Sequence, residues 1–182
     1  MRAPVTQTSH VYVQVPASCV QKLLSTMIVS LAHDSSSAQV RAAVFEGLTF
    51  VLDNRLSHGV LKKLLPSLSS CLHDTSERVR ASFAKMLLSV KSLRTIRYFD
   101  VVNLTSVLDR LAEDRARKRV ASPLTALLLN SFFPRTGGRE RQLGRALALL
   151  QRHPDAAFAF FEHLHEHVRG VRAHSLLTFS LE

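Results

Sequence analysis

The sequence lacks tryptophan and has only two tyrosines, six glycines and six prolines among its 182 residues. The shortage of Trp and Tyr argues against a ligand cage built mostly of aromatic rings. With 46% hydrophobic residues and so little Gly and Pro, the composition is that of a chain that buries a core and not of a disordered tail. The two cysteines, Cys19 and Cys71, are too few for a secreted disulfide framework, so we expect free thiols in a reducing compartment.

Signals for membranes, secretion and catalysis are also missing. No run approaches the roughly 18 uninterrupted apolar residues of a membrane span, and polar residues follow Met1–Pro4 where a secretory signal would be apolar. The sequence has no G-x-S-x-G elbow, no G-x-x-x-x-G-K-[ST] phosphate loop and no G-x-G-x-x-G turn. We therefore expect neither an enzyme nor a protein with a cofactor, a metal site, a small-molecule substrate or a membrane contact.

What the sequence does contain is a repeat with a period of about 40 residues. Aspartates stand at positions 34, 74 and 114, each closing a similar tetrapeptide, and Asp155 follows near the next expected position. A valine comes a few residues after each of the first three aspartates, at Val40, Val79 and Val120. A period of this length is typical of stacked helical repeats.

Apolar residues around each aspartate follow the spacing of one helix face. The faces predicted after the turns are Val40, Val44, Gly47, Leu48 and Val51; Val79, Phe83, Met86, Leu87 and Val90; Val120, Leu124, Leu127 and Leu128; and Ala157, Phe161, Leu164, His165 and Val168. Those predicted before the turns include Leu24, Ile28 and Leu31; Leu61, Leu65, Leu68 and Leu72; Val107, Leu108 and Leu111; and Leu143, Ala146, Leu147 and Leu150. Each unit is thus expected to be helix, short turn, helix.

Helix pairs with single apolar faces are stable when they stack on one another. The sequence therefore predicts an all-α fold, an α-solenoid of about four helix pairs in an armadillo-like superhelix. A closed four-helix bundle is the alternative, and the equal spacing of the units favours the stack. We expect a lead-in at residues 1–16, which includes the one strand-like run at 11–15, the solenoid at 17–169 and a tail at 170–182.

The turns also carry a family resemblance. Asp34 with Val40-Arg41, and Asp74 with Val79-Arg80, resemble the HEAT repeat. The resemblance implies a structural ladder along the turns, made by Asp34, Arg41, Asp74 and Arg80. The third unit departs from the pattern, because Ala121 and not arginine follows Val120.

A closer resemblance covers about residues 30–168. Segments 52–58, 64–66, 72–80, 130–134 and 165–167 resemble the HEAT-repeat G-type subunit of condensin II, and the most specific is Leu-His-Asp-Thr-Ser-Glu-Arg-Val-Arg at 72–80. This implies a non-enzymatic scaffold that binds the kleisin and SMC subunits of condensin II and acts on mitotic chromosomes in the nucleus. Family members are several times longer, so a fragment or a shortened form is expected.

Basic residues are concentrated in the middle of a chain whose net charge is +10. Residues 75–145 hold 15 basic and 6 acidic side chains. If stacked turns align them, eight cations could form a stripe along a DNA backbone without reading its sequence: Arg115, Arg117, Lys118, Arg119, Arg135, Arg139, Arg141 and Arg145. The alternatives are a solvated face, or a HEAT adaptor or nuclear-transport protein that binds acidic peptides and no chromatin.

Two smaller clusters are expected to be structural. His163 and His167 are spaced as helical metal ligands can be, but a third ligand and the H-E-x-x-H order are missing, so we expect helix histidines, with His165 at a core position. The phenylalanines at 132–133 and 158–161 could border a groove, although their spacing favours the core.

Overall fold

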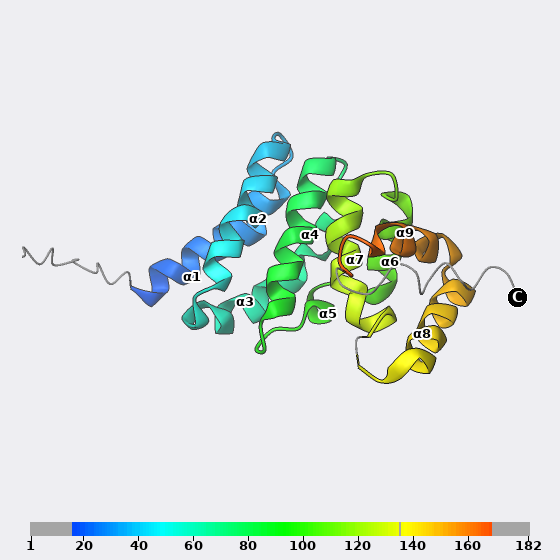
Figure 1. Ribbon diagram of the computed structural model, residues 1–182. Helices are drawn as coiled ribbons and strands as arrows, with labels where there is room; N and C mark the ends of the chain where they lie inside the picture. Colours follow the sequence, from blue (N-terminus) through cyan, green and yellow to red (C-terminus); the bar gives the residue numbers. More distant parts are fainter. Residues whose placement is uncertain (1–15, 135, 169–182) are drawn as a thin grey trace, which may run out of the picture.

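The computed structural model describes residues 16–134 and 136–168, and every regular element within these residues is helical (Figure 1). The first helix pair is α1 (Ala17–Ser25), extended by η1 (Thr26–Ser30) and η2 (Leu31–His33), with α2 (Ala38–Leu52). The second is α3 (His58–Leu64), extended by η4 (Leu65–His73), with α4 (Glu77–Ser92). The third is α6 (Leu104–Glu113) with α7 (Lys118–Phe132), and the fourth is α8 (Gly138–Arg152) with α9 (Pro154–Leu164). The short helices η3 (Arg55–Ser57) and α5 (Tyr98–Val101) lie in the connections.

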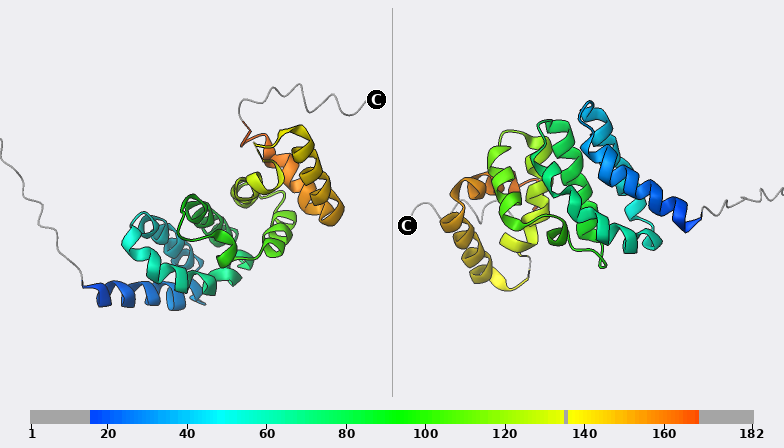
Figure 2. Two further views of the ribbon diagram at one scale, coloured as in Figure 1. Left: turned by 90° about the horizontal axis from the view of Figure 1, so that it is seen from below. Right: turned by 180° about the vertical axis from the view of Figure 1, so that it is seen from behind.

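The pairs stack into an open, curved row, which is clearest from below (Figure 2). The second helices α2, α4 and α7 pack side by side, and α9 packs on α7. The core runs along the row and not around one centre: Phe45 of α2 meets Phe83 of α4 edge to face, with ring centroids 5.0 Å apart. The predicted all-α repeat solenoid is thus confirmed. The predicted lead-in and tail fall almost wholly outside the described residues, as does the strand-like run at 11–15.

Local sequence signals explain where several helices begin and change. The Asp34 carboxylate accepts hydrogen bonds from the backbone N–H groups of Ser36 and Ser37, and the Ser37 hydroxyl accepts one from Val40 N–H at the start of α2. Pro66 coincides with the change from the α-helical turns of α3 to the 3₁₀ turns of η4. A proline cannot donate the α-helical hydrogen bond, which accounts for the change.

Most predicted core positions are buried, but the first valine of the series is not. Val79 and Val120 are fully buried, whereas Val40 is 37% exposed. The physical reason is position in the stack: in the described chain no helix pair precedes α2 to cover Val40, while α4 and α7 each have a neighbour on that side. The predicted burial of Val40 was therefore wrong.

The fourth pair departs most from the repeat. The expected inner residues of α8, which are Leu143, Leu147 and Leu150, are exposed, and Leu149 is the buried one. The cause is that α9, and not α8, packs against both α6 and α7. Helix α8 therefore lies on the outside of the stack, where it contacts α7 and α9 and buries only Leu149. On α9, Phe160 is buried against Phe132, while Phe158 and Phe161 are exposed.

Candidate functional site

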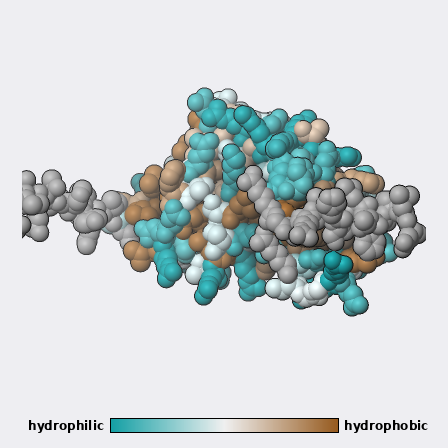
Figure 3. Space-filling view, viewed as in Figure 1, coloured by the Kyte–Doolittle hydropathy of each residue, from teal (hydrophilic) through white to brown (hydrophobic). Residues whose placement is uncertain are grey.

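The turns inside the first three helix pairs lie together along one edge of the molecule, the upper edge in Figure 1. The space-filling view shows this edge as largely hydrophilic, whereas hydrophobic surface gathers at the end formed by α1 and α2 (Figure 3). The exposed apolar side chains at that end include Leu23, Val29 and Phe50. The predicted ladder residues Asp34, Arg41, Asp74 and Arg80 lie at or beside these turns.

An arginine of α2 and an arginine of α4 each reach the aspartate of the next turn. Arg41 Nε lies 2.7 Å from Asp74 Oδ2, Arg41 Nη2 lies 2.9 Å from Asp74 Oδ1, and a third N–H of Arg41 donates to the Asp34 carbonyl oxygen. Such a two-point contact orients both partners and is stronger than a single neutral hydrogen bond. It ties the first helix pair to the second.

The next rung is buried more deeply. Arg80 makes the same two-point contact with Asp114, at 2.7 and 2.8 Å, and the Asp114 side chain is fully buried. Burial alone would raise the pKa of Asp114, but the hydrogen bonds and charges of Arg80, with the charge of Arg110, outweigh it and lower that pKa. The Asp114 carboxylate is thus held ionised between the second and third pairs.

Two arginines of this rung were not predicted from the sequence. Arg117 Nη1 lies 2.9 Å from Asp114 Oδ1, and Arg110 Nη1 lies 3.7 Å from Asp114 Oδ2. The third unit lacks an arginine after Val120, where Ala121 stands. Its aspartate, Asp114, is nevertheless at the regular position and binds Arg80 of the second unit. The 40-residue spacing of the aspartates was the signal for this contact.

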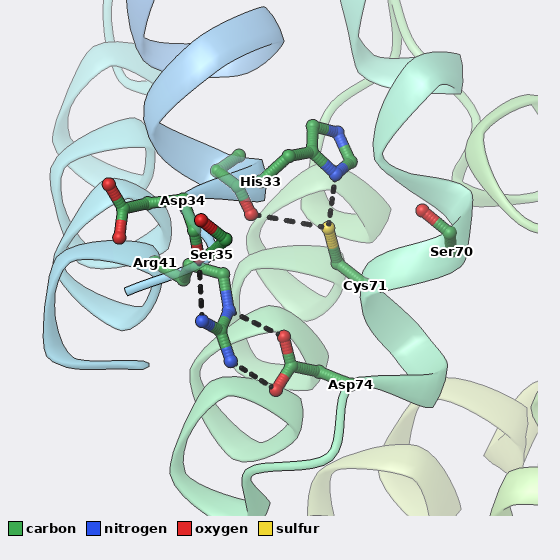
Figure 4. A pocket seen from close by; sticks show the side chains of 8 residues that line it. His33, Asp34, Ser35, Arg41, Ser70, Cys71 and Asp74 are labelled. Carbon is green, nitrogen blue, oxygen red and sulfur yellow. Dashed lines mark hydrogen bonds and ion pairs between the residues drawn. The ribbon is translucent and has the colours of Figure 1, made fainter. Parts of the chain in front are cut away.

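A small open pocket lies at the first rung, between the first two turns (Figure 4). It has a volume of about 230 Å³ and its lining residues include His33, Ser70, Cys71 and Asp74. Cys71 Sγ lies 3.8 Å from the Ala32 carbonyl oxygen and 4.0 Å from His33 Nδ1. Burial, followed by the charge of Asp74, raises the pKa of the Cys71 thiol to about 11, so this thiol stays protonated at neutral pH.

The four basic residues predicted at the third turn are mostly paired with carboxylates. Arg115 contacts Glu162 of α9, Arg117 contacts Asp114, and Lys118 Nζ lies 2.9 Å from Glu166. The hydrogen bonds from Lys118 and then Ser122 lower the pKa of Glu166 to about 2. Arg115 thus joins the third turn to α9, Lys118 joins α7 to the segment after α9, and part of the charge of these cations is neutralised.

The arginines of α8 are different. Arg139, Arg141 and Arg145 are exposed, and no hydrogen bond or ion pair to another described residue holds them. They follow the C-terminal end of α7, whereas Arg115–Arg119 lie at its N-terminal end, roughly 22 Å away for a helix of this length. The structure thus places the predicted cations in two groups and not in one run of adjacent turns, and Arg135 lies outside the described residues.

The histidines near the end of α9 bind backbone groups. The ring Nε2 atoms of His163 and His167 lie 2.9 Å from the carbonyl oxygens of Arg115 and Ser122, respectively. His163 is the buried member of the cluster and His165 is exposed, so the predicted core position of His165 was wrong. The helix ends at Leu164, which removes the regular spacing on which that prediction depended.

A second, wider hollow crosses the second helices of the first three pairs. It has a volume of about 560 Å³, and it is lined mainly by charged and small side chains: Glu46, Glu77, Arg78, Ala81, Ser82, Lys85 and Arg119. Carboxylates and cations alternate along it, so it suits a polar, mixed-charge segment better than an apolar ligand. We call it the helix groove.

Other kinds of site are not supported within residues 16–134 and 136–168. No group of three or more His, Cys, Asp or Glu side chains there could hold a metal ion. In the same part of the chain, none of the helices has the length and apolar character that crossing a bilayer requires.

Comparison with known proteins identifies relatives of one kind. The chain is 39% identical over 170 residues to condensin-2 complex subunit G2 of Xenopus laevis, 41% over 149 residues to that of Danio rerio and 38% over 160 residues to that of Homo sapiens. These matches cover 93%, 82% and 88% of this chain but only 14%, 13% and 14% of the relatives. No family model matches the chain, and no solved structure matches it.

The match to the Xenopus laevis protein covers 170 of the 182 residues, so the similarity spans the stacked helix pairs. The chain is therefore a homologue of condensin-2 complex subunit G2 and matches one segment of that family.

Proposed function

We propose that this chain is a non-enzymatic HEAT-repeat scaffold of a condensin-2 complex, working on chromosomes in the nucleus during mitotic condensation. The observation that carries the proposal is the 38–41% identity to condensin-2 complex subunit G2 across most of the chain. The stacked helix pairs support it, because an open row offers long surfaces for other chains and no enclosed site for turnover.

We propose the helix groove as the binding surface for an extended kleisin segment. The groove crosses three helix pairs and carries Glu46 and Glu77 beside Arg78, Lys85 and Arg119. A groove of mixed charge gives a polypeptide a defined register through complementary charges. We propose that the SMC subunits associate with this chain as members of the same condensin-2 complex.

We propose that DNA contacts α8. Arg141, Arg145 and Arg152 recur at helical spacing along one exposed face, and Arg139 lies at the start of the same helix. Their charges are free to replace counterions on phosphate, whereas those of Arg115, Arg117 and Lys118 already meet carboxylates. We therefore assign the main contribution to α8 and a smaller one to the third turn.

Salt-dependent binding of duplex DNA tests this assignment. Changing Arg139, Arg141 and Arg145 together to Gln should make the negative slope of log affinity against log salt less steep by about 2.7. This corresponds to about 0.9 for each of the lost phosphate contacts. The matched control changes Arg55, Lys62 and Lys63 to Gln, which removes the same charge from exposed positions on the first two pairs. Equal slopes for both triple variants would contradict a DNA surface on α8. Absence of DNA retention in the unaltered chain would instead favour an adaptor for acidic peptides.

Co-purification tests the protein partner. The chain should recover kleisin and SMC subunits from mitotic cells, and Ser82→Arg, which fills the helix groove, should reduce that recovery. Ser92→Arg is the control, because Ser92 is exposed at the end of the same helix α4 and does not line the groove. Recovery of neither subunit by the unaltered chain would count against the condensin assignment.

A further inference from the structure

Arg110 lies between the second and third turns, and the equivalent position one repeat earlier has no arginine. Arg110 Nη2 lies 2.9 Å from His73 Nδ1 and 2.8 Å from Glu113, while Arg110 Nη1 lies 3.7 Å from Asp114. The Arg110 side chain is only 11% exposed. Its guanidinium thus fills the space between the histidine of one turn and the aspartate of the next.

The first and second turns present the same surroundings without that arginine. Forty residues before His73, Arg110, Leu111 and Asp114 stand His33, Ser70, Cys71 and Asp74, and all four line the 230 Å³ pocket. Both residues that differ in size are smaller here: serine replaces arginine, and cysteine replaces leucine. The pocket is therefore the space that a guanidinium occupies one repeat later (Figure 4).

The charges around the pocket favour a cation. Its lining residues include Asp34, Asp74 and one cation, Arg41, and the Asp34 carboxylate points away from Cys71 and His33 (Figure 4). Hydrogen bonds from Ser36 and Ser37 lower the pKa of Asp34, and burial is outweighed by hydrogen bonds from Arg41 and Ser76 to lower that of Asp74, so both are ionised at neutral pH. Arg41 binds the Asp74 carboxylate as Arg80 binds that of Asp114, and the Asp114 carboxylate still has a second arginine, Arg110, beside it.

The acceptor geometry favours arginine over lysine. In the later turn one guanidinium spans the histidine ring nitrogen and the region of the carboxylate, which a planar fork with five donors can do and a single ammonium cannot. The pocket is smaller than the roughly 300 Å³ of a typical small-molecule site, and His33 and Ser70 at its mouth are exposed. It has room for one side chain entering from outside.

We propose that this pocket, the first-turn pocket, binds an arginine side chain of a partner protein, in the manner in which the later turn holds Arg110. The partner segment would cross the turn edge and place its guanidinium over Cys71, between His33 Nδ1 and Asp74. We infer this from the two turns of the same chain, independently of the condensin assignment.

Titration of the full chain with a minimal probe tests the proposal. The probe is acetyl-Gly-Arg-Gly-amide, the comparison is its lysine counterpart at equal ionic strength, and the readout is the ring NMR signals of His33. We expect saturable shifts with the arginine peptide and affinity about tenfold weaker for the lysine peptide, because the second donor contact is lost. Equal shifts with both peptides, or shifts that do not saturate, would overturn the proposal.

Two neighbouring serines supply a matched pair of variants. Ser70→Arg should seat its own guanidinium as Arg110 does and abolish peptide binding, whereas Ser69→Arg adds the same charge at the adjacent exposed position and should change affinity less than about twofold. A crystal structure of the first variant should show the new guanidinium within hydrogen-bond distance of His33 Nδ1. His33→Ala, at an exposed position, should weaken binding about tenfold even if Ser70→Arg does not fold, and calorimetric titration measures it because this variant has no His33 ring signal. Loss of binding in Ser69→Arg, or unchanged binding in His33→Ala, would contradict an arginine pocket.

Discussion

At the scale of single residues, Asp114 shows how one buried charge joins two repeats. It comes from the end of α6, receives Arg80 from α4, and is flanked by Arg110 and Arg117. A buried carboxylate without partners would cost several kcal/mol, and here two-point hydrogen bonding offsets that cost. Its counterpart Asp34 meets only its own turn, through Ser36 and Ser37.

Replacing Asp114 with Asn should therefore destabilise the protein far more than the same change at Asp34. We expect Asp114→Asn to lower the free energy of unfolding by about 3–5 kcal/mol, since Arg80 is left buried without its carboxylate. Asp34→Asn should leave the unfolding midpoint nearly unchanged, because that side chain is not paired with arginine in the described chain. Urea unfolding followed by circular dichroism measures both, and similar midpoints for the two variants would refute the difference.

The same pairs make stability depend on pH in a defined direction. The folded-state pKa values of Asp74 and Asp114 lie below their ordinary values. Their contribution is thus fully present above about pH 4, where unfolded aspartate is ionised, and is lost as pH falls through the lower folded-state values. Unfolding free energy should fall steeply from pH 5 to pH 2 in the unaltered chain and less steeply in Asp114→Asn. Parallel curves would show that Asp114 is not a source of this dependence.

Equivalent valines provide a second comparison between an inner and an outer repeat. Val79→Ala should cost about 2 kcal/mol, because Val79 is fully buried between α4 and its neighbours. Val40→Ala should cost less than about 0.5 kcal/mol, since Val40 is partly exposed at the end of the row. Thermal unfolding of the two variants checks this, and a Val40→Ala cost equal to that of Val79→Ala would mean that something covers α2.

At the scale of elements, α8 is the helix that the repeat pattern describes least well. Only Leu149 among its apolar residues is buried, and the helix begins at Gly138, where both Gly138 and the preceding Gly137 have positive φ. A positive φ is readily adopted by glycine and is strained in other residues. The turn before α8 therefore depends on glycine, while Gly144 within the helix does not serve such a role.

Two glycine-to-alanine changes should accordingly have opposite effects. Gly137→Ala should destabilise α8 by about 1–2 kcal/mol, because φ is +100° and the new Cβ would lie 2.5 Å from Arg141 Cδ. Gly144→Ala should stabilise it by about 0.5–1 kcal/mol, because no neighbouring atom lies within 4 Å of the new Cβ and alanine favours helix. The unfolding midpoints of both variants, compared with that of the unaltered chain, test these two predictions. Stabilisation by Gly137→Ala would show that the turn before α8 does not require glycine.

At the scale of the whole molecule, stability is distributed along a row. Each pair contacts its immediate neighbours, so an inner pair is held on two sides and an end pair on one. Exposed apolar side chains lie at both ends, with Leu23 and Phe50 at one and Leu143 at the other, and also in the connections, at Leu56 and Phe99.

Amide hydrogen exchange should reflect this arrangement. Protection should be greatest in α4 and α7 and least in α1 and α8, since opening an end pair exposes one interface and opening an inner pair exposes two. Exchange measured by mass spectrometry on the full chain resolves these helices. Equal protection of α1 and α4 would indicate one cooperative globule instead of a stack.

Sequence alone determined the repeat, the helix pairs and the register of the aspartates, because a 40-residue period and 3.6-residue spacing are written in neighbouring residues. Val79, Leu124 and Phe83 were correctly placed in the core on that basis. Only the tertiary structure decided which pairs have neighbours, which explains why Val40 and Leu143 are exposed, and where α9 ends, which explains the exposure of His165.

The same division holds for the charged residues. The spacing of Asp74 and Asp114 could be seen in the sequence, but the ion-pair partners of Arg115 and Lys118 are 47 and 48 residues away. Ion pairs at such separations depend on how helices stack, so the sequence could show that cations cluster but not which ones are neutralised. The first-turn pocket likewise exists because stacking brings His33 opposite Ser70, where side-chain volume leaves a space.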